Sequence, residues 1–231
     1  RNCFDRVSFD LIYARQDQTL SAWRDELKQA LNMAIDHLSL YQLTVETGTA
    51  FGDRYAIGKL RGLPNDDLSA DMYEVTQDVC KSYGLPMYEV SNHAKPGSES
   101  RHNLIYWQYG DYVGIGPGAH GRVTSSNQRF ATECVMTPGG WLENVHTGSA
   151  ESKRTLLTTQ EQSEEYLMMG LRVKSGIDVE RYESLAGRAL DPEARRSLGE
   201  LGLIQDHGKR IIVNKQGFMV LNAIISEFLV G

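Results

Sequence analysis

The first ninety residues alternate between strand-like and helix-like hydrophobic patterns, and this alternation constrains the fold most. Val7 to Tyr13, Leu38 to Thr44 and Met87 to Val90 are short apolar runs typical of strands, the first of them buried. Between them, apolar residues recur at helical spacing from Leu20 to Ala34, with Thr19 as a candidate N-cap, and from Leu68 to Val79. This order predicts parallel βαβ units. Three strands cannot close a barrel, so we expect an α/β fold that is the later part of an open (β/α) barrel.

The pattern changes after residue 155. Thr158 and Glu161 fit a capping box that opens a helix, and Asp191 followed by proline fits the start of another. A third helix is expected over 178–186, a hairpin over 203–213 and a closing helix over 216–229. These elements predict a small α+β domain that is winged-helix-like. We therefore divide the chain into a partial barrel over 1–125, a connector over 126–155 and the winged-helix-like domain over 156–231.

Composition excludes some classes of function. The net charge is −6, and acidic residues outnumber basic ones in the winged-helix-like domain, so we expect no nucleic-acid partner. Apolar runs are too short to span a membrane. Three scattered cysteines indicate reduced thiols and a cytoplasmic setting.

The residues from Arg101 to Arg122 are typical of a ligand-facing loop and strand. This stretch packs four aromatic residues, two histidines and five glycines into 22 positions. Gly114 to Gly121 matches the dinucleotide pattern GxGxxG only superficially, because a proline interrupts it and no amphipathic helix follows. In the alternative interpretation, His102 and Asn103 cap a turn and the aromatic residues belong to the core.

Four motifs, in this order, resemble the HemW-like branch of the oxygen-independent coproporphyrinogen III oxidase-like radical SAM family. They are FDLIYA at 9–14, HLSLYQLTVETGTAF at 37–51, YEVSNHAKPG at 88–97, and HNLIYW at 102–107 followed by GDYVGIGPGAHG at 110–121. At His93 this family usually has an aromatic residue. The resemblance covers nearly the whole chain and implies a heme chaperone, a radical SAM barrel and a C-terminal winged-helix module.

The chain departs from the family at the iron–sulfur cluster. Radical SAM proteins hold a [4Fe–4S] cluster on a CxxxCxxC motif, whereas Cys3, Cys80 and Cys134 are widely separated here. The sequence begins at Arg1 within a strand-like run. We therefore expect a C-terminal fragment that is inactive alone, whose cluster-binding part lies upstream. A half barrel leaves a strand edge unpaired, so we also expect dimerisation, aggregation or dependence on another polypeptide.

The resemblance implies two sets of site residues. S-adenosyl-L-methionine would be contacted by residues on two strands and by the glycine-rich run, namely Asp10, Thr44, Ile115, Gly116 and His120. Heme would be contacted by residues of the HNxxYW motif, namely His102, Asn103, Tyr106 and Trp107. His102 would bind the iron, the aromatic rings would cover the porphyrin, and Arg101 or Arg122 would pair with a propionate.

Three functions remain open. The resemblance favours a protein that binds heme and delivers it to an apo-hemoprotein acceptor, membrane-associated acceptors included. The second is oxygen-independent coproporphyrinogen III oxidation in porphyrin and heme biosynthesis, in which a 5′-deoxyadenosyl radical abstracts hydrogen from each propionate. The third is a non-catalytic scaffold or interaction fragment, which would have no affinity for a tetrapyrrole.

Overall fold

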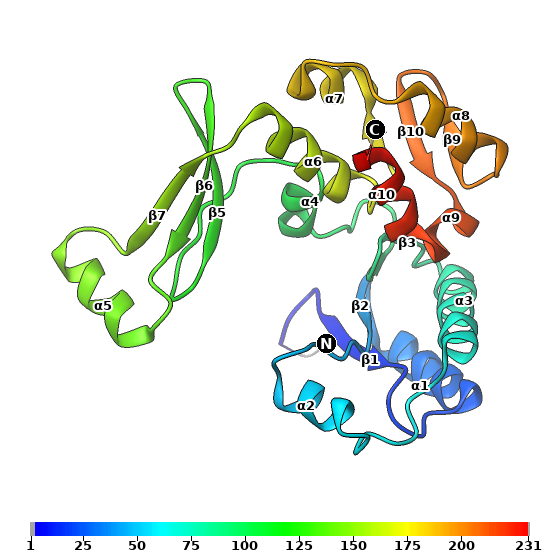
Figure 1. The fold of residues 1–231 in the computed structure, drawn as a ribbon. Coiled ribbons are helices and arrows are strands. Elements are labelled where there is room, and N and C mark those ends of the chain that lie inside the picture. Colours follow the sequence, from blue (N-terminus) through cyan, green and yellow to red (C-terminus); the bar gives the residue numbers. More distant parts are fainter. Residues whose placement is uncertain (1–2, 231) are drawn as a thin grey trace. The chain divides into compact units, whose positions relative to one another are not determined.

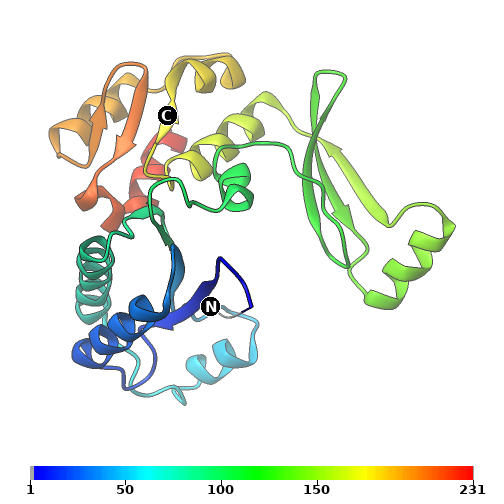
Figure 2. The ribbon, with the colours of Figure 1, turned by 180° about the vertical axis from the view of Figure 1, so that it is seen from behind.

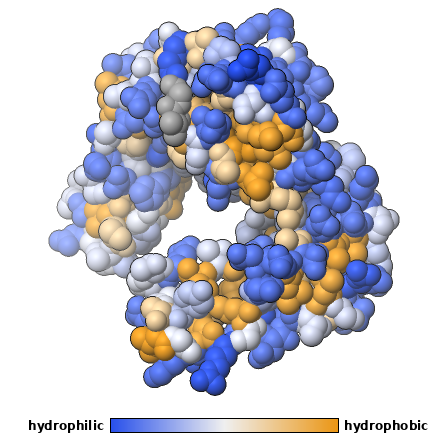
Figure 3. Space-filling view, turned by 45° about the vertical axis from the view of Figure 1, so that its right-hand side comes forward, coloured by the Kyte–Doolittle hydropathy of each residue, from blue (hydrophilic) through white to orange (hydrophobic). Residues whose placement is uncertain are grey.

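The structure is a computed structural model that describes residues 3–230. They form two compact units, which join between Glu99 and Ser100 (Figures 1 and 2). The division at residues 125 and 155 stays a prediction. None of the helices in the described part of the chain combines the length and apolar character needed to cross a bilayer. On the face seen in Figure 3, apolar side chains lie in separate patches among polar ones.

The first unit is a small sheet with helices. Its elements in chain order are β1 (Ser8–Tyr13), α1 (Leu20–Met33), β2 (His37–Gln42), α2 (Ala50–Ala56), α3 (Asp66–Ser82), β3 (Met87–Glu89) and β4 (Asn92–Ala94). β1 and β2 are parallel and joined by α1, as predicted. The sheet order is β1-β2-β4-β3. β4 is antiparallel to both of its neighbours, so the third predicted strand, β3, does not pair with β2. The chain reverses at residues 90–91, and the short return strand takes the position beside β2.

α1 and α3 cover one face of this sheet and form the core of the first unit with it. Trp23 is fully buried, stacks on Tyr13 with ring centroids 5.1 Å apart, and donates a 2.8 Å hydrogen bond to Thr76. Thr19 caps α1 through its side chain, as predicted. β1 is not the buried strand that we expected, because Ser8 and alternate residues after it are exposed. It lies at the edge of the sheet, and only one of its faces meets the helices.

The second unit contains two antiparallel sheets. Its elements are α4 (Arg101–Trp107), β5 (His120–Ser125), β6 (Gln128–Cys134), α5 (Pro138–Thr147), β7 (Glu151–Leu156), α6 (Thr159–Gly170), β8 (Ile177–Asp178), α7 (Val179–Ala186), α8 (Pro192–Glu200), β9 (Ile204–Asp206), β10 (Arg210–Val213), α9 (Lys215–Met219) and α10 (Leu221–Val230). One sheet has the order β5-β6-β7 and the other β8-β10-β9. Residues 126–155, predicted as a connector, thus contain β6, α5 and most of β7.

The helix signals in the C-terminal part are confirmed. Thr158 and Glu161 form a complete capping box at the start of α6. Asp191 caps α8, with Pro192 in its first turn. The predicted hairpin is β9 and β10. The predicted closing helix is divided in two, since the chain leaves helical geometry at Val220 between α9 and α10.

Candidate functional site

The first candidate surface is the face of the sheet opposite α1 and α3. Asp10 is exposed on β1 and lies opposite Ser39 of β2 in the strand register. His37 shares this face, because its position is two residues before Ser39. Thr44 lies two residues beyond the end of β2, is exposed, and donates a 3.3 Å hydrogen bond to the carbonyl oxygen of Gln42. Asp10 and Thr44 thus lie in one unit, at its open face and strand end.

His37 is a residue whose role sequence reasoning missed. Its Nδ1 atom lies 2.7 Å from the hydroxyl of Ser8, and its Nε2 atom lies 3.0 Å from the hydroxyl of Tyr88. Burial lowers the pKa of His37, while the nearby carboxylates of Asp36 and Asp10 oppose that shift. The imidazole therefore ties β1 and β2 to β3. The polar residues at alternate positions of the first two strands were the signal in the sequence.

A buried polar pair lies at the turn between β3 and β4. Glu89 is fully buried and accepts hydrogen bonds from the side-chain amide of Asn92 and the backbone N–H of Ser91. Burial raises the pKa of Glu89, and these two hydrogen bonds oppose the rise. The side-chain oxygen of Asn92 is buried without a hydrogen-bond partner among the described residues. This pair fixes the reversal that places β4 beside β2.

The HNLIYW motif lies on a helix, α4, and not on the loop and strand that we expected. Ser100 is the residue before the helix, and its side chain accepts a hydrogen bond from the backbone N–H of Asn103. The Nε2 atom of His102 lies 3.0 Å from the hydroxyl oxygen of Tyr106. The ring of Tyr106 in turn meets the ring of Tyr112 edge-on, with centroids 4.3 Å apart. His102 is exposed, and the three rings form a continuous aromatic cluster.

Trp107 lies on a different side of α4 from His102, since five residues of an α-helix correspond to a rotation of about 140°. It lines a cavity of about 470 Å³ together with Tyr166 and Arg181. Arg181 donates hydrogen bonds to the carbonyl oxygens of residues 108 and 109 and lies over the ring of Tyr166. The motif therefore presents one pair of side chains outward and Trp107 towards the C-terminal helices.

The glycine-rich run after α4 leads into a strand. Gly116 has a φ of +117°, which favours glycine, and Ile115 beside it is 81% exposed. A Cβ atom on Gly121 would lie 2.9 Å from the backbone nitrogen of Gly114, so the chain passes itself closely here. His120 is exposed at the start of β5. A strand after this run, and no helix, agrees with the rejection of a dinucleotide site.

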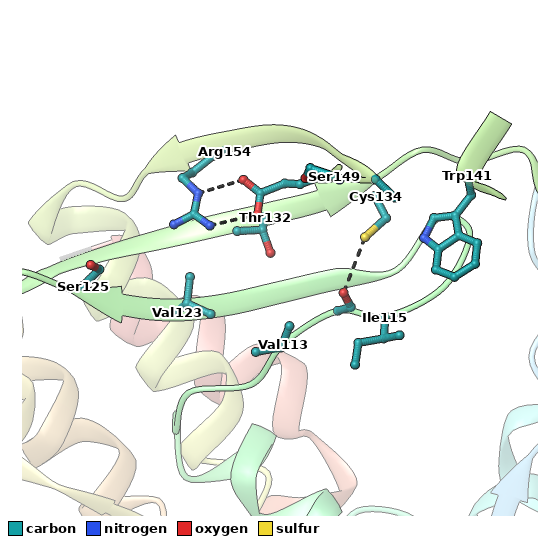
Figure 4. A pocket seen from close by; sticks show the side chains of 12 residues that line it. Val113, Ile115, Val123, Ser125, Thr132, Cys134, Trp141, Ser149 and Arg154 are labelled. Carbon is teal, nitrogen blue, oxygen red and sulfur yellow. Dashed lines mark hydrogen bonds and ion pairs between the residues drawn. The ribbon is translucent and has the colours of Figure 1, made fainter. Parts of the chain in front are cut away.

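An apolar pocket of about 400 Å³ lies on the β5-β6-β7 sheet, and sequence reasoning missed it (Figure 4). Val113 and Ile115 border it from the glycine-rich run, and Trp141 borders it from α5. Cys134 lies in its wall and donates a 3.5 Å hydrogen bond to the carbonyl oxygen of Gly114. The glycine-rich run therefore borders an apolar pocket through Val113 and Ile115.

Arg122 is held by a carboxylate and does not extend freely towards a ligand. Its guanidinium donates to Glu165 of α6 at 2.6 and 3.0 Å, and Tyr109 donates to the same carboxylate at 2.9 Å. This hydrogen bonding raises the pKa of Arg122, while burial opposes the rise. Arg129 lies 3.9 Å from the ring centroid of Tyr109. The cluster fixes the start of β5 against α6 and leaves Arg101, which is exposed, as the candidate cation.

The described residues do not fit an iron–sulfur cluster. Across residues 3–230, His, Cys, Asp and Glu side chains form no group of three or more that could hold a metal ion. Cys3 is exposed, Cys80 is buried in the core of the first unit, and Cys134 is on β6 of the second.

Comparisons with known proteins identify relatives of the chain. Residues 157–220 match the family model described as HemN C-terminal domain. The chain is 32% identical over 235 residues to heme chaperone HemW of Bacillus subtilis, covering 98% of this chain and 59% of that protein. Over almost its whole length the chain is thus similar to HemW-like radical SAM proteins. It is 34% identical to the mitochondrial radical S-adenosyl methionine domain-containing protein 1 of Danio rerio, covering 98% of this chain and 53% of that relative.

A solved structure confirms the fold class of this HemW-like chain. The coproporphyrinogen III oxidase HemN of Escherichia coli, described as a radical SAM enzyme, superposes with a TM-score of 0.73 at 18% sequence identity. The match covers 97% of this chain and 55% of that one. The HemW-like chain thus spans somewhat more than half the length of the relatives that it matches.

The two predicted sets of site residues are distributed differently over the units. His102 and Tyr106 are brought together on α4, and Asn103 and Trp107 lie on the same helix. The cofactor set is divided, because Asp10 is in the first unit with Thr44, whereas the other three residues are in the second. That these five residues share one site stays a prediction.

Proposed function

We propose that this chain is the heme-handling part of a HemW-like radical SAM protein. It binds heme beside α4 and passes it to an apo-hemoprotein acceptor. The observation that carries the proposal is the exposed imidazole of His102, at the end of a cluster formed with Tyr106 and Tyr112. Relatives over almost the whole chain are named heme chaperones, which supports the choice of cargo.

The chemistry of the cluster suits a porphyrin. Heme iron accepts an imidazole nitrogen as an axial ligand, and the macrocycle requires apolar or aromatic cover. His102 offers the nitrogen, and the ring of Tyr106 offers an aromatic face beside it. Arg101 precedes His102 in the same helical turn and can pair with a propionate in the bidentate geometry that guanidinium favours. Asn103 and Trp107 lie on the same helix, and Trp107 lines the cavity that Tyr166 and Arg181 also border.

We further propose that the cofactor set borders S-adenosyl-L-methionine in the whole protein. Asp10 can accept hydrogen bonds from ribose hydroxyls or the ammonium group, and Thr44 offers a hydroxyl and a backbone carbonyl. Gly116 lets the backbone approach a flat ligand, with Ile115 and His120 on either side of it. S-adenosyl-L-methionine bound to a [4Fe–4S] cluster supplies radical chemistry, and the described residues would contribute only binding and orientation.

The setting of the protein is proposed as cytoplasmic, with heme as cargo and no nucleic acid as partner. The acceptor is proposed as an apo-hemoprotein, either free or associated with a membrane. Among the described residues β1 pairs only with β2, so its other edge is unpaired in the first unit. Dimerisation through this edge remains part of the proposal.

A hemin titration tests the function. Absorbance in the Soret region is followed while hemin is added to the 231-residue chain, to His102→Ala and to His146→Ala, which removes an exposed histidine of α5. We expect a saturable shift near one equivalent, which His102→Ala loses and His146→Ala keeps. A shift that survives in His102→Ala, or no saturable shift, would refute a heme site at α4 in this chain.

Coproporphyrinogen III oxidation is the alternative that the fold allows. The structural neighbour is a coproporphyrinogen III oxidase, but at 18% identity the likeness extends to the fold alone. The whole protein, given coproporphyrinogen III, S-adenosyl-L-methionine and a reductant, would yield a vinyl-bearing product if it catalysed this reaction. Such a product would displace the chaperone proposal.

A further inference from the structure

The nitrogen of His102 that faces away from its own backbone is already engaged in the structure. His102 and Tyr106 are four residues apart on α4, so their side chains lie over one another on the same helix face. The Nε2 atom lies 3.0 Å from the phenol oxygen, and the two rings meet edge-on at 86° with centroids 4.8 Å apart. This hydrogen bond occupies the outer end of the imidazole.

Only one ring nitrogen of His102 suits an iron at the centre of a porphyrin. Nδ1 is bonded to the ring carbon that carries Cβ, so a macrocycle centred there would collide with the side chain's own stem and the turn of α4. Nε2 is at the far end of the ring and is free of this collision. Iron requires an unprotonated nitrogen with a free lone pair. In either tautomer the contact with Tyr106 takes Nε2, because Nε2 either accepts the phenol proton or donates its own.

We propose that Tyr106 masks the iron-binding nitrogen of His102 until heme arrives, and that heme displaces it. This inference rests on the proposed function and concerns how the same site is regulated. The hydrogen bond between Nε2 and the phenol oxygen is exchanged for a bond between Nε2 and iron. If Nε2 carries the proton, the proton moves to Nδ1 through solvent as the iron binds. The hydroxyl of Tyr106 then turns to solvent.

Tyr112 holds the mask in place. Its ring meets the ring of Tyr106 edge-on, with centroids 4.3 Å apart. Its backbone N–H donates to the carbonyl of Arg122 at 2.7 Å, and Arg122 is bonded to Glu165. Tyr112 is therefore attached to the sheet and, through Arg122, to α6. The ring of Tyr106 thus contacts both this fixed ring and the imidazole of His102.

The cost of displacing the mask follows from the strength of one partly exposed hydrogen bond. Such a bond contributes about 0.5–1.5 kcal/mol net, which corresponds to a factor of about 2 to 12 in affinity. Removing the hydroxyl alone should therefore tighten heme binding by about that factor. Removing a hydroxyl that supported the iron ligand would instead weaken binding.

The experiment compares three variants of the 231-residue chain by hemin titration. Tyr106→Phe removes the masking hydroxyl and keeps the ring, Tyr55→Phe removes an exposed tyrosine hydroxyl of α2 in the first unit, and His102→Ala removes the ligand. We expect Tyr106→Phe to bind hemin about 2- to 12-fold more tightly than the native chain. Tyr55→Phe should match the native chain. The Soret position should be the same in all three chains that retain His102, since the same nitrogen binds the iron.

Two results would overturn the proposal that Tyr106 masks the iron-binding nitrogen of His102. Unchanged or weaker binding by Tyr106→Phe would show that the hydroxyl does not compete with iron. A different Soret position in that variant would show that the phenol itself binds iron. Native-like binding by His102→Ala would instead overturn the proposed function. Circular dichroism checks the fold of each variant. In the ligand-free chain, the ¹⁵N shifts of His102 should change in Tyr106→Phe and not in Tyr55→Phe, and unchanged shifts in Tyr106→Phe would contradict the hydrogen bond.

Discussion

His93 is a buried histidine without a hydrogen-bond partner, and replacing it with phenylalanine should stabilise the chain, most of all in acid. The side chain is 1% exposed, and neither of its ring nitrogens has a partner among the described residues. In the strand register it lies opposite Leu38 of β2 and Met87 of β3. Family resemblance expects an aromatic residue at this position. We therefore expect His93→Phe to fit between the same apolar neighbours.

The lowered pKa of the buried His93 sets how much stability the chain loses in acid. Burial, followed by the proximity of His37, lowers the pKa of His93 from 6.5 to about 4. Above pH 6.5 the imidazole is neutral whether the chain is folded or unfolded. Below pH 6.5, His93 takes up a proton in the unfolded chain but stays neutral in the folded chain. The free energy of unfolding therefore decreases as the pH falls from 6.5 towards 4. The loss is about 2 kcal/mol at pH 5 and approaches about 3 kcal/mol at lower pH.

Urea unfolding at several pH values between 7.5 and 5 measures the effect. The stability advantage of His93→Phe over the native chain should grow by about 2 kcal/mol between these limits. Fluorescence reports on the same core through the buried Trp23. His146→Phe, at an exposed position of α5, is the matched control for exchanging a histidine for phenylalanine. An advantage of His93→Phe that stays constant with pH would refute the reasoning that burial keeps this imidazole neutral.

Two further predictions concern stability and reactivity. Gly176→Ala should destabilise the chain by more than about 1 kcal/mol in thermal or urea unfolding, because φ is +68° and the new methyl group would collide with the carbonyl oxygen of Ile211. Gly187→Ala, with a φ of +67° and open space around it, should cost less, and equal losses would contradict the role of the collision. Burial raises the pKa of Cys80 to about 12, so its thiol should resist iodoacetamide at pH 8 in the folded chain, whereas exposed Cys3 is alkylated. Mass spectrometry of the labelled peptides checks this, and rapid labelling of Cys80 would contradict its burial.

Local signals in the sequence were enough for most of the helices. Thr19, Thr158 and Asp191 were recognisable as caps, because capping depends on residues within three positions along the chain. The parallel pair β1 and β2 followed from the spacing of apolar runs around α1. The division of the closing helix at Val220 was not foreseen, since its apolar residues continue at helical spacing across the break.

The strand order of the first unit depends on long-range pairing that could not be predicted from the sequence. β4 displaces β3 from the position beside β2 through hydrogen bonds between residues some fifty positions apart, which hydrophobic periodicity does not encode. For the same reason sequence reasoning missed the roles of His37 and His93. Neighbouring strands direct His37 towards Ser8 and Tyr88, whereas His93 is enclosed beside Leu38.

The sequence by itself determined the residue types of the candidate site, because HNLIYW and the glycine-rich run are contiguous motifs whose resemblance to HemW-like proteins is read without a structure. The tertiary structure decided which of those residues are available. Helical geometry places His102 and Tyr106 on one face of α4 and Trp107 on another. A hydrogen bond with Tyr106 occupies the Nε2 atom of His102. Arg122 forms an ion pair with Glu165, 43 residues further along the chain, and is therefore not free to pair with a propionate. Whether a side chain can bind a ligand depends on which groups it contacts, and tertiary packing determines these contacts.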